Sequence, residues 1–395
     1  MPGPENRFGS RGVRRGAALT LVFASVLATA AATGSLPRGD GRSTEIEARS
    51  VASTADRDAV ADAAAEAVAD GKSGTEAAEE AVSRSGDRWG AVYDEREYQE
   101  FEQALDGSYT GVGLAARRSA DGLVTVTRVQ RGGPAARAGI RAGDLLRTVD
   151  GHRVDKRAVS DVVALLRGDR TGAAVGSTVV LGVQRGSVTR TETLRRARLT
   201  TEAVSVRRLG PYRSDSSAAV LIEVDSFTKG SGTAVRDAVL KAPTGAGVLL
   251  DLRGNSGGLV TEAVTAASAF LDGGLVATYD VHGEQRALYA EAGGDTERPL
   301  VVLVDGGTMS AAELLTGALQ DRGRAVTVGS RTFGKGSVQM PSKLAGGSVA
   351  ELTVGHYRTP AGRSVDGRGI TPDLAVSARA QERAETVLSG LGGGS

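Results

Sequence analysis

The sequence of 395 residues contains no cysteine, which excludes disulfide bonds, thiolate metal sites and cysteine nucleophiles. Its three histidines lack HExxH or any other metal-ligand spacing, so we expect neither a metal site nor a cofactor. The formal net charge is +1, and no basic run is accompanied by aromatic residues. This balance argues against a nucleic-acid partner. A chain of this length is expected to hold two or three domains, each with a core of its own.

The first 40 residues combine positive charge with an apolar run. Arginines between residues 7 and 15 precede GAALTLVFASVLATAAATG, which has the length of a signal-peptide core or a weak membrane span. Small residues end this run, and cleavage after Ala30 or Ala32 fits them. Positive charge before an apolar run keeps the start of a chain in the cytoplasm. We therefore expect residues 1–40 to be a signal peptide or an N-terminal membrane anchor. The rest of the chain would be exported, either secreted or anchored to the outer face of the cytoplasmic membrane.

Residues 41–106 are expected to contain an N-terminal helical segment. The stretches TADRDAVADAAAEAVADG, TEAAEEAVSR and DEREYQEFEQALDG are rich in residues with high helix propensity, and Gly71 ends the first of them. Because such short helices are marginal alone, they are expected to pack on the rest of the protein or on a second copy, as in a homo-oligomer. The alternative is a helix-prone spacer without fixed structure.

Residues 107–198 contain the stretch GLVTVTRVQRGGPAARAGIRAGDLLRTVDGHRV, in which alternating strands flank a Gly-Gly-Pro turn and a short helix. This pattern resembles the GSPAxxAGIxxGDxIxxVDG signature of bacterial PDZ domains. The resemblance implies that a C-terminal tail adds to an edge strand, with its carboxylate bound by backbone N–H groups. These groups would come from Gly111, Val112, Gly113 and Leu114. The alternative is that the two glycines only shape the entry to a strand.

Residues 199–376 are expected to form one core domain, and residues 218–376 within it alternate between strand and helix patterns, which predicts a mixed α/β core with crossover connections. Active groups on such folds tend to lie where strands end and helices begin. Two junctions fit this position: DLRGNSGGL, which contains Gly257 and Gly258, and VDGGTMSAAELL, which places Ser310 at a helix start. Each helix N-terminus offers free backbone N–H groups and a positive dipole end. Two such ends aimed at one point would form an oxyanion hole.

The stretch GSRTFGKGSVQ nearly matches a phosphate-binding loop, but Gly336 stands where that loop needs Ser or Thr for magnesium. Another role for Lys335 is to accept the proton of a serine, once burial has lowered its pKa from about 10.4 toward neutrality. The Ser-Lys pairing is a known variant of nucleophilic hydrolysis. Taken alone, Ser310 is an ordinary helix cap and Lys335 a solvated turn lysine; only their combination supports the catalytic interpretation.

The stretches DLRGNSGG, GGTMSAAELLTGALQDRGRAVTVGSRTFGKGSVQ and GHYRTPAGRSVDGRGITPD resemble the C-terminal processing (tail-specific) serine proteases. The resemblance implies a mixed α/β (α+β) fold, with a crotonase-like (ClpP-like) βαβ protease core, an inserted PDZ domain and the N-terminal helical segment. It also implies a catalytic set with defined roles: Ser310 as nucleophile, Lys335 as general base, Gln339 as the group that orients the lysine, and the backbone N–H groups of Gly258 and Ala311 as the oxyanion hole.

The resemblance therefore implies an exported serine endopeptidase that acts on proteins with accessible, apolar C-terminal tails. One alternative is a non-catalytic PDZ scaffold that binds exported tails. A second alternative is a hydrolase assisted by His282 or His356. Met309 and Ala312 depart from the family's usual residues beside the nucleophile, so the adjoining pocket is expected to be tighter. Residues 377–395 match no family pattern and are expected to form a short helix and a C-terminal tail.

Overall fold

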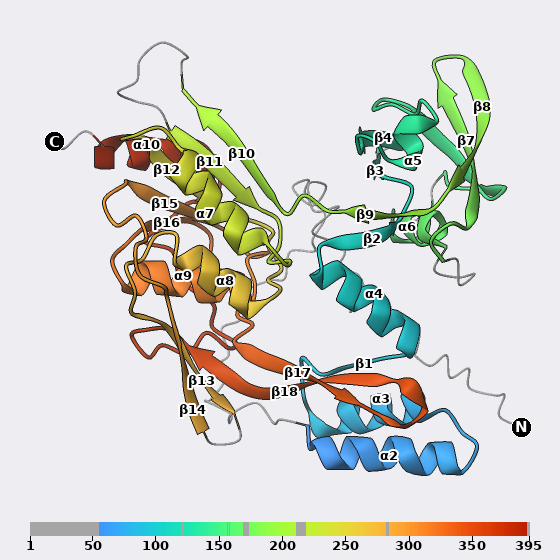
Figure 1. The fold of residues 1–395 in the computed structure, drawn as a ribbon, viewed down its shortest axis with the longest axis horizontal. Helices are drawn as coiled ribbons and strands as arrows, with labels where there is room; N and C mark the ends of the chain where they lie inside the picture. Colours follow the sequence, from blue (N-terminus) through green and yellow to red (C-terminus); the bar gives the residue numbers. More distant parts are fainter. Residues whose placement is uncertain are drawn as a thin grey trace, which may run out of the picture. The chain divides into compact units, whose positions relative to one another are not determined.

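The computed structural model describes residues 55–392, apart from 120–121, 156, 158, 169–173, 211–218 and 282–283. Residues 108–200 form one compact unit, which we call the inserted unit. The described parts of 55–107 and 201–392 form the other, which we call the core unit (Figure 1). The expected signal peptide or anchor lies outside the described residues. Within the range that is described, none of the helices has the length and apolar character needed to cross a membrane.

The inserted unit is built mainly of antiparallel strands. A six-stranded sheet has the order β3-β4-β5-β7-β8, with β6 paired to β5, and β2 pairs with β9 in a separate ribbon. Because β2 and β9 are the first and last strands of the unit, its two ends lie side by side, as an insertion into a continuous chain requires. The elements are β2 (Ser108–Gly111), β3 (Leu114–Arg118), β4 (Val124–Val129), α5 (Pro134–Arg137), β5 (Leu145–Val149), β6 (His152–Arg153), α6 (Val159–Arg167), β7 (Thr178–Arg185), β8 (Val188–Arg195) and β9 (Ala197–Thr200).

The core of the inserted unit follows from strand alternation. In β4, Val124 and Val126 are buried while the residue between them is not, which is the period of a strand with one face on a core. Leu146 of β5 and Leu181 of β7 are fully buried in the same cluster. Strand β3 lies at the edge of the sheet, so one side of its backbone has no strand partner among the residues that the structure describes.

The core unit contains a six-stranded sheet of order β10-β11-β12-β15-β16-β19. Strands β11, β12, β15, β16 and β19 run parallel, and β10 joins the edge in the antiparallel direction. The predicted mixed α/β core is thereby confirmed. The strands are β10 (Val204–Leu209), β11 (Ala219–Val224), β12 (Gly247–Asp251), β15 (Leu300–Val304), β16 (Val326–Gly329) and β19 (Leu374–Ala375); the helices are α7 (Ser231–Lys241), α8 (Val260–Ala267), α9 (Ala311–Asp321) and α10 (Ala380–Gly392).

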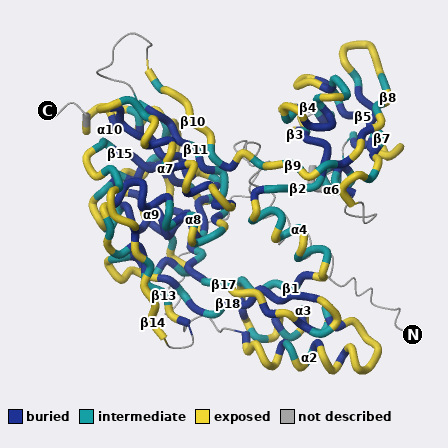
Figure 2. The backbone as a smooth tube through the Cα atoms, in the orientation of Figure 1, coloured by how far each residue is buried: buried dark blue, intermediate teal, exposed yellow. Residues whose placement is uncertain are grey.

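Helices cover both faces of this sheet, and alternate residues of each strand face them. Leu250 and Val302 belong to the large cluster with the buried residues of α7, α8 and α9. Leu249 and Leu303 face the other side, where they pack with Ala384 and Leu388 of α10. The helix expected within residues 377–395 thus packs on the sheet along its length. Figure 2 shows the result: β15 and α9 are buried almost throughout.

A second, five-stranded sheet lies in the core unit, with the order β1-β18-β13-β14 and β17 paired to β18. Helices α2 and α3 pack on the hairpin of β17 and β18 through Val60, Ala64, Val82 and Leu352. Strand β1 interrupts the stretch expected to be helical, and pairs with β18. The elements are α2 (Arg57–Ala69), α3 (Gly74–Ser85), β1 (Ala91–Tyr93), α4 (Glu95–Leu105), β13 (Leu275–Val281), β14 (Glu284–Tyr289), β17 (Ser337–Lys343), η4 (Ala345–Gly347) and β18 (Val349–Arg358).

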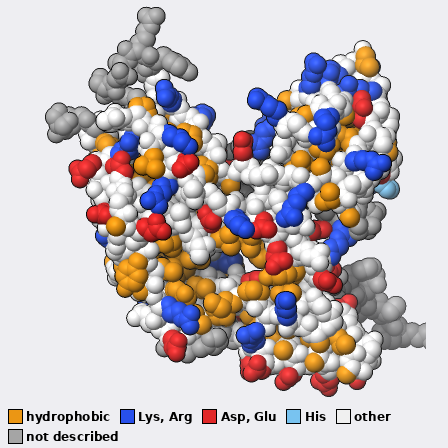
Figure 3. Space-filling view, in the orientation of Figure 1, with side chains coloured by type: hydrophobic (Ala, Val, Ile, Leu, Met, Phe, Trp, Pro, Cys, Tyr) orange, Lys and Arg blue, Asp and Glu red, His pale blue; other side chains and the backbone are white. Residues whose placement is uncertain are grey.

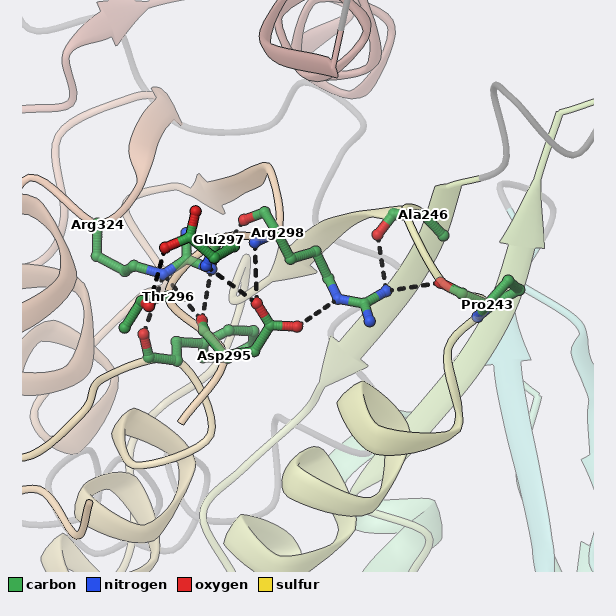
Figure 4. A network of polar contacts seen from close by, with 8 residues as sticks. Pro243, Ala246, Asp295, Thr296, Glu297, Arg298 and Arg324 are labelled. Atoms are coloured by element: carbon green, nitrogen blue, oxygen red, sulfur yellow. Dashed lines mark hydrogen bonds and ion pairs between the residues drawn. The ribbon is translucent and has the colours of Figure 1, made fainter. Parts of the chain in front are cut away.

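A polar network fixes the loop that leads into β15 (Figure 4). The guanidinium of Arg298 bonds the carboxylate of Asp295 at 2.9 Å and the carbonyls of Pro243 and Ala246 at 3.0 and 2.8 Å. The guanidinium of Arg324 donates to the carbonyls of Asp295 and Arg298 at 2.8 Å each. These bonds tie the amino ends of β12 and β15 together, at the edge of the sheet opposite the junctions singled out in the sequence.

Candidate active site

The loops that follow β12 and β15 are joined at the carboxyl end of the sheet. The two strands are parallel neighbours, so their carboxyl ends meet at one edge. The carboxylate of Asp305 accepts from the N–H groups of Gly254 and Gly307, each at 2.8 Å. The N–H of Met309 donates to the carbonyl of Asn255 at 2.8 Å. The two junctions predicted from the sequence are therefore one structural site.

Ser310 occupies the N-cap position of α9 in an unusual backbone conformation. Its φ is 53° and its ψ is −119°, a region that non-glycine residues seldom adopt because the side chain crowds the backbone. Such strain typically costs about 1–3 kcal/mol and is found at functional sites when the surroundings enforce it. Gly257 is part of those surroundings: a Cβ at this position would lie 2.8 Å from Cβ of Ser310. The glycine permits the first loop to lie directly against the serine.

The residues whose N–H groups are predicted as an oxyanion hole are Gly258, which follows Gly257 in the chain, and Ala311, which follows Ser310. Gly258 has a φ of 132° and bridges to Phe227, while Ala311 is the first residue of α9. The buried amide of Asn255 fixes the glycine loop, since it donates to the carbonyl of Val224 and accepts from Gly257, each at 2.8 Å. Within the described residues, neither the Gly258 nor the Ala311 N–H donates a hydrogen bond, so both are free for a developing negative oxygen.

Glu313 connects the serine to the lysine loop. Its fully buried carboxylate accepts from the N–H of Ser310 at 3.0 Å and from the N–H of Lys335 at 2.8 Å. It also accepts from the hydroxyl of Thr332 and from the N–H of Gly334. Burial raises the pKa of Glu313, whereas these four donors act to lower it. One carboxylate thus fixes the backbone of both predicted catalytic residues.

Lys335 lies in the loop between β16 and β17 and is half-buried. Burial lowers the pKa of its amine, and the negative charges of Glu351 and Asp87 act in the opposite direction. Its Nζ lies 5.3 Å from the ring centroid of Trp89. Ser310 and Lys335 are both described, and in this conformation their side chains form no hydrogen bond with each other. The structure brings the two backbones together and directs the amine toward an aromatic ring.

Gln339 contacts Trp89 as well. It lies on β17, half-buried, and its Nε2 donates to the carbonyl oxygen of Trp89. The resemblance implies that Gln339 orients Lys335. In this conformation the amide nitrogen of Gln339 instead bonds the backbone of Trp89, whose ring lies against the lysine amine. No sequence signal marked Trp89, since a lone tryptophan in a helix-prone stretch fits any packing role.

Tyr357 is a further residue that the sequence did not single out as functional. It is almost fully buried on β18, and its hydroxyl lies 2.9 Å from the carbonyl oxygen of Ser310 and 3.3 Å from that of Lys335. Burial raises its pKa well above the usual value, so it remains a neutral donor. Neighbouring residues of a strand point to opposite faces, so His356 faces away from this site, with its Nε2 3.8 Å from Asp366. His282, the other histidine considered, lies outside the described residues.

The predicted carboxylate-binding residues lie between β2 and β3 of the inserted unit. Gly111 ends β2, Val112 is buried in the core, Gly113 has a φ of 77°, and Leu114 begins β3. The carbonyl oxygens of Val112 and Gly113 accept from Ala135 and Gln130 at 2.8 Å each. These bonds fix the loop at the start of an edge strand, which is the place strand addition requires. Among the described residues, no cluster of His, Asp or Glu could hold a metal ion.

Comparison with known families finds a match in each unit. Residues 219–376 match the model of peptidase family S41, and residues 125–185 match the PDZ domain. The first range contains the core-unit residues described above for the candidate active site, apart from Asp87 and Trp89. The second covers most of the inserted unit.

Individual relatives agree with this assignment. The chain is 34% identical to "Carboxyl-terminal-processing peptidase 2, chloroplastic" of Arabidopsis thaliana, over 74% of this chain and 58% of that protein. It is 30% identical to a "Probable CtpA-like serine protease" of Staphylococcus aureus, over 75% of this chain and 58% of that protein. The chain thus spans less than two thirds of these curated relatives. A solved photosystem II D1 C-terminal processing protease matches with a TM-score of 0.50 and 29% identity, over 80% of this chain and 86% of that one.

Proposed function

We propose that this chain is a serine endopeptidase of the C-terminal processing type, because residues 219–376 match the model of peptidase family S41 and residues 125–185 match that of the PDZ domain. The observation that carries the proposal is the Glu313 carboxylate, which binds the backbone of Ser310 and of Lys335 at once. It places a strained serine beside two free N–H groups and near a half-buried lysine. That combination suits the hydrolysis of a peptide bond.

In the proposed reaction, Oγ of Ser310 attacks the carbonyl carbon of the scissile bond while Nζ of Lys335 accepts the hydroxyl proton. The negative oxygen of the tetrahedral intermediate is bound by the N–H groups of Gly258 and Ala311. The lysine then gives the proton to the leaving amine, and the acyl group stays on the serine. The neutral lysine then takes a proton from a water molecule, whose oxygen bonds to the acyl carbon. The bond between that carbon and Oγ breaks, and the lysine returns the proton to Oγ, which restores Ser310 and releases the acid. The lysine side chain must leave its position at Trp89 to reach Oγ, and the backbone fixed by Glu313 provides the pivot.

Substrate selection is assigned to the inserted unit. A protein's C-terminal tail would add as a strand to the free edge of β3, and its carboxylate would bind the N–H groups between Gly111 and Leu114. Apolar tails fit because the residues around this loop, such as Val112, belong to an apolar cluster. In the core unit, Phe333 and Met340 are 44% and 41% exposed. Figure 3 shows hydrophobic side chains gathered over the part of the core unit where β17 and β18 lie, a surface suited to an extended peptide.

The alternative, a PDZ scaffold without catalysis, explains fewer observations. A scaffold has no need for a positive φ at Ser310 or for two unbonded N–H groups beside it. A carboxylate buried between the serine and lysine loops would only add the cost of its own desolvation. The match to peptidase family S41 also favours the protease.

Three further features extend the proposal. The arginines and apolar run at the start of the chain support an exported enzyme, either secreted or anchored to the outer face of the cytoplasmic membrane. The parallel strands β11, β12, β15 and β16, connected by helices, support a crotonase-like (ClpP-like) core. Helices α2 and α3 pack on the hairpin of β17 and β18, which supports a place in the core unit for the N-terminal helical segment.

The test compares full-length variants on a peptide with an apolar C-terminal tail. Ser310→Ala and Lys335→Ala are expected to lose cleavage while keeping the circular dichroism spectrum of the parent chain. Lys241→Ala, a change at an exposed lysine in the last turn of α7, serves as the matched control and is expected to keep full activity. The same peptide with a C-terminal amide should be cleaved more slowly, because the PDZ loop loses its anion. Undiminished cleavage by Ser310→Ala would refute the proposal.

A further inference from the structure

The turn of residues 87–90, between α3 and β1, reaches into the candidate active site. The ring of Trp89 lies 5.3 Å from Nζ of Lys335 and 5.7 Å from the ring of Phe333, in the same loop as the lysine. A cation within about 6 Å of an indole centroid is attracted by the negative face of the ring. Trp89 comes from a part of the chain far from the peptidase family match, yet it contacts the proposed general base.

Hydrogen bonds fix this turn to the strands that carry the lysine loop. The buried carboxylate of Asp87 accepts from the N–H and the hydroxyl of Thr353, each at 2.8 Å, and from the N–H groups of Trp89 and Gly90 at 3.0 and 2.9 Å. Gln339 donates to the carbonyl of Trp89. Gln339 and Thr353 are cross-strand partners on β17 and β18, so one pair of residues holds both sides of the turn. The ring position is therefore determined by the fold.

Charged groups face Lys335 and Trp89 from several elements. Glu351 of β18 and Asp87 of the turn act on the lysine amine, and Glu102 of α4 acts on Glu351 in turn. Burial raises the pKa of Glu351 to about 7, despite the opposing charge of Lys335. The guanidinium carbon of Arg88 lies 4.8 Å from the Trp89 centroid. Glu313 binds the lysine backbone from the other side.

We propose that Trp89 is a positioning residue for Lys335, whose ring binds the protonated amine and releases it toward Ser310 when the amine becomes neutral. The contact between Trp89 and Lys335 is given by the distance between them, whereas its role in catalysis rests on the proposed function. In this arrangement Gln339 acts on the lysine through Trp89, because its amide fixes the backbone of the residue that carries the ring.

The contact with Trp89 should change the pKa of Lys335 in one direction. Attraction between the ring and the amine favours the charged form, so removal of the ring lowers the pKa of Lys335. For a cation–π contact of ordinary strength, the acidic limb of kcat/KM should move down by roughly half a pH unit to one and a half pH units in Trp89→Leu. Trp89→Phe retains an aromatic face and should shift the limb by less. A merely structural role would lower kcat/KM at every pH without moving the limb.

The chain contains one tryptophan, so its fluorescence reports on this site alone. Emission of the full-length chain would be followed against pH in the Ser310→Ala background, which prevents self-cleavage. Glu351→Gln is added to remove the neighbouring carboxyl. We expect a fluorescence step that persists in Glu351→Gln, moves to lower pH there because a negative charge is lost, and disappears when Lys335→Met is added.

The outcomes separate this inference from the proposed function. A step that survives Lys335→Met, or one that vanishes with Glu351→Gln alone, overturns the inference. An unmoved acidic limb in active Trp89→Leu and Trp89→Phe overturns it as well, and this measurement does not depend on the Glu351 variant folding. If the fluorescence step follows Lys335 but the parent chain cleaves no peptide, the contact stands and the proposed function fails.

Discussion

Replacing Gly257 with alanine tests whether the loop after β12 holds the nucleophile in place. Gly257 has a φ of 96°, and a Cβ there would lie 2.8 Å from Cβ of Ser310, 2.9 Å from the carbonyl oxygen of Met309 and 3.1 Å from N of Ala311. A side chain in the left-handed region costs about 1–2 kcal/mol. An added methyl in a packed site costs about 1–3 kcal/mol more. The free energy of unfolding should therefore fall by about 2–5 kcal/mol in total.

The effect on activity should be larger than the loss of stability suggests. The methyl group pushes on Ser310 and on the N–H of Ala311 together, and loss of one oxyanion donor typically costs about 10²–10³ in rate. Gly245→Ala is the matched control: its φ of 77° is also positive, but nothing lies within 4 Å of the added Cβ. That control should lose only the backbone cost of about 1–2 kcal/mol and keep its kcat/KM.

Both variants would be assayed for cleavage of the tailed peptide and for unfolding in denaturant. Trp89 fluorescence follows the core unit specifically, since the single tryptophan lies there. If Gly257→Ala loses no more stability than Gly245→Ala and cleaves as fast, the glycine loop does not press on the serine. The proposed oxyanion geometry would then be wrong.

Two other predictions concern buried and paired carboxylates. Glu313→Ala removes the acceptor of four donors, which belong to Ser310, Thr332, Gly334 and Lys335. The variant should lose at least about 3 kcal/mol of its free energy of unfolding and should not cleave peptide. Unchanged stability would contradict this prediction. Burial tends to raise the pKa of Asp295, but its bonds to Arg298 outweigh this and lower it. Its stabilisation is therefore present above about pH 4 and is lost as pH falls through the lowered pKa. Asp295→Asn should be less stable than the parent at pH 7 and equal to it at low pH; an equal deficit at both would contradict the assignment.

The strand and helix order of the core could be read from the sequence because its signals are local. Apolar runs such as those of β12 and β15 mark strands buried on both faces, and Ser310 precedes an apolar helix at regular spacing. The parallel order of those strands then places both junctions at one edge. The structure shows these two junctions joined at that edge by hydrogen bonds between their loops.

Other features depend on contacts that no local pattern encodes. Strand β1 is short and follows helix-prone residues, and it exists because β18 offers an edge to pair with. The direction of the Gln339 amide depends on where the 87–90 turn lies, and that turn is fixed by Asp87 and Thr353, which are distant in sequence. The sequence also could not show that Glu313 connects the serine to the lysine loop, because its four hydrogen-bond donors come from two separate loops.

The central claim is that a neutral Lys335 activates the hydroxyl of Ser310. The most direct measurement is the rate at which a fluorophosphonate labels the full-length chain as a function of pH. The account predicts label on Ser310, with a rate that rises with pH and a midpoint below the usual lysine value of about 10.4. In Lys335→Met the rate should be low and nearly independent of pH. Label on another residue, or the same pH-dependent rate in Lys335→Met, would contradict it.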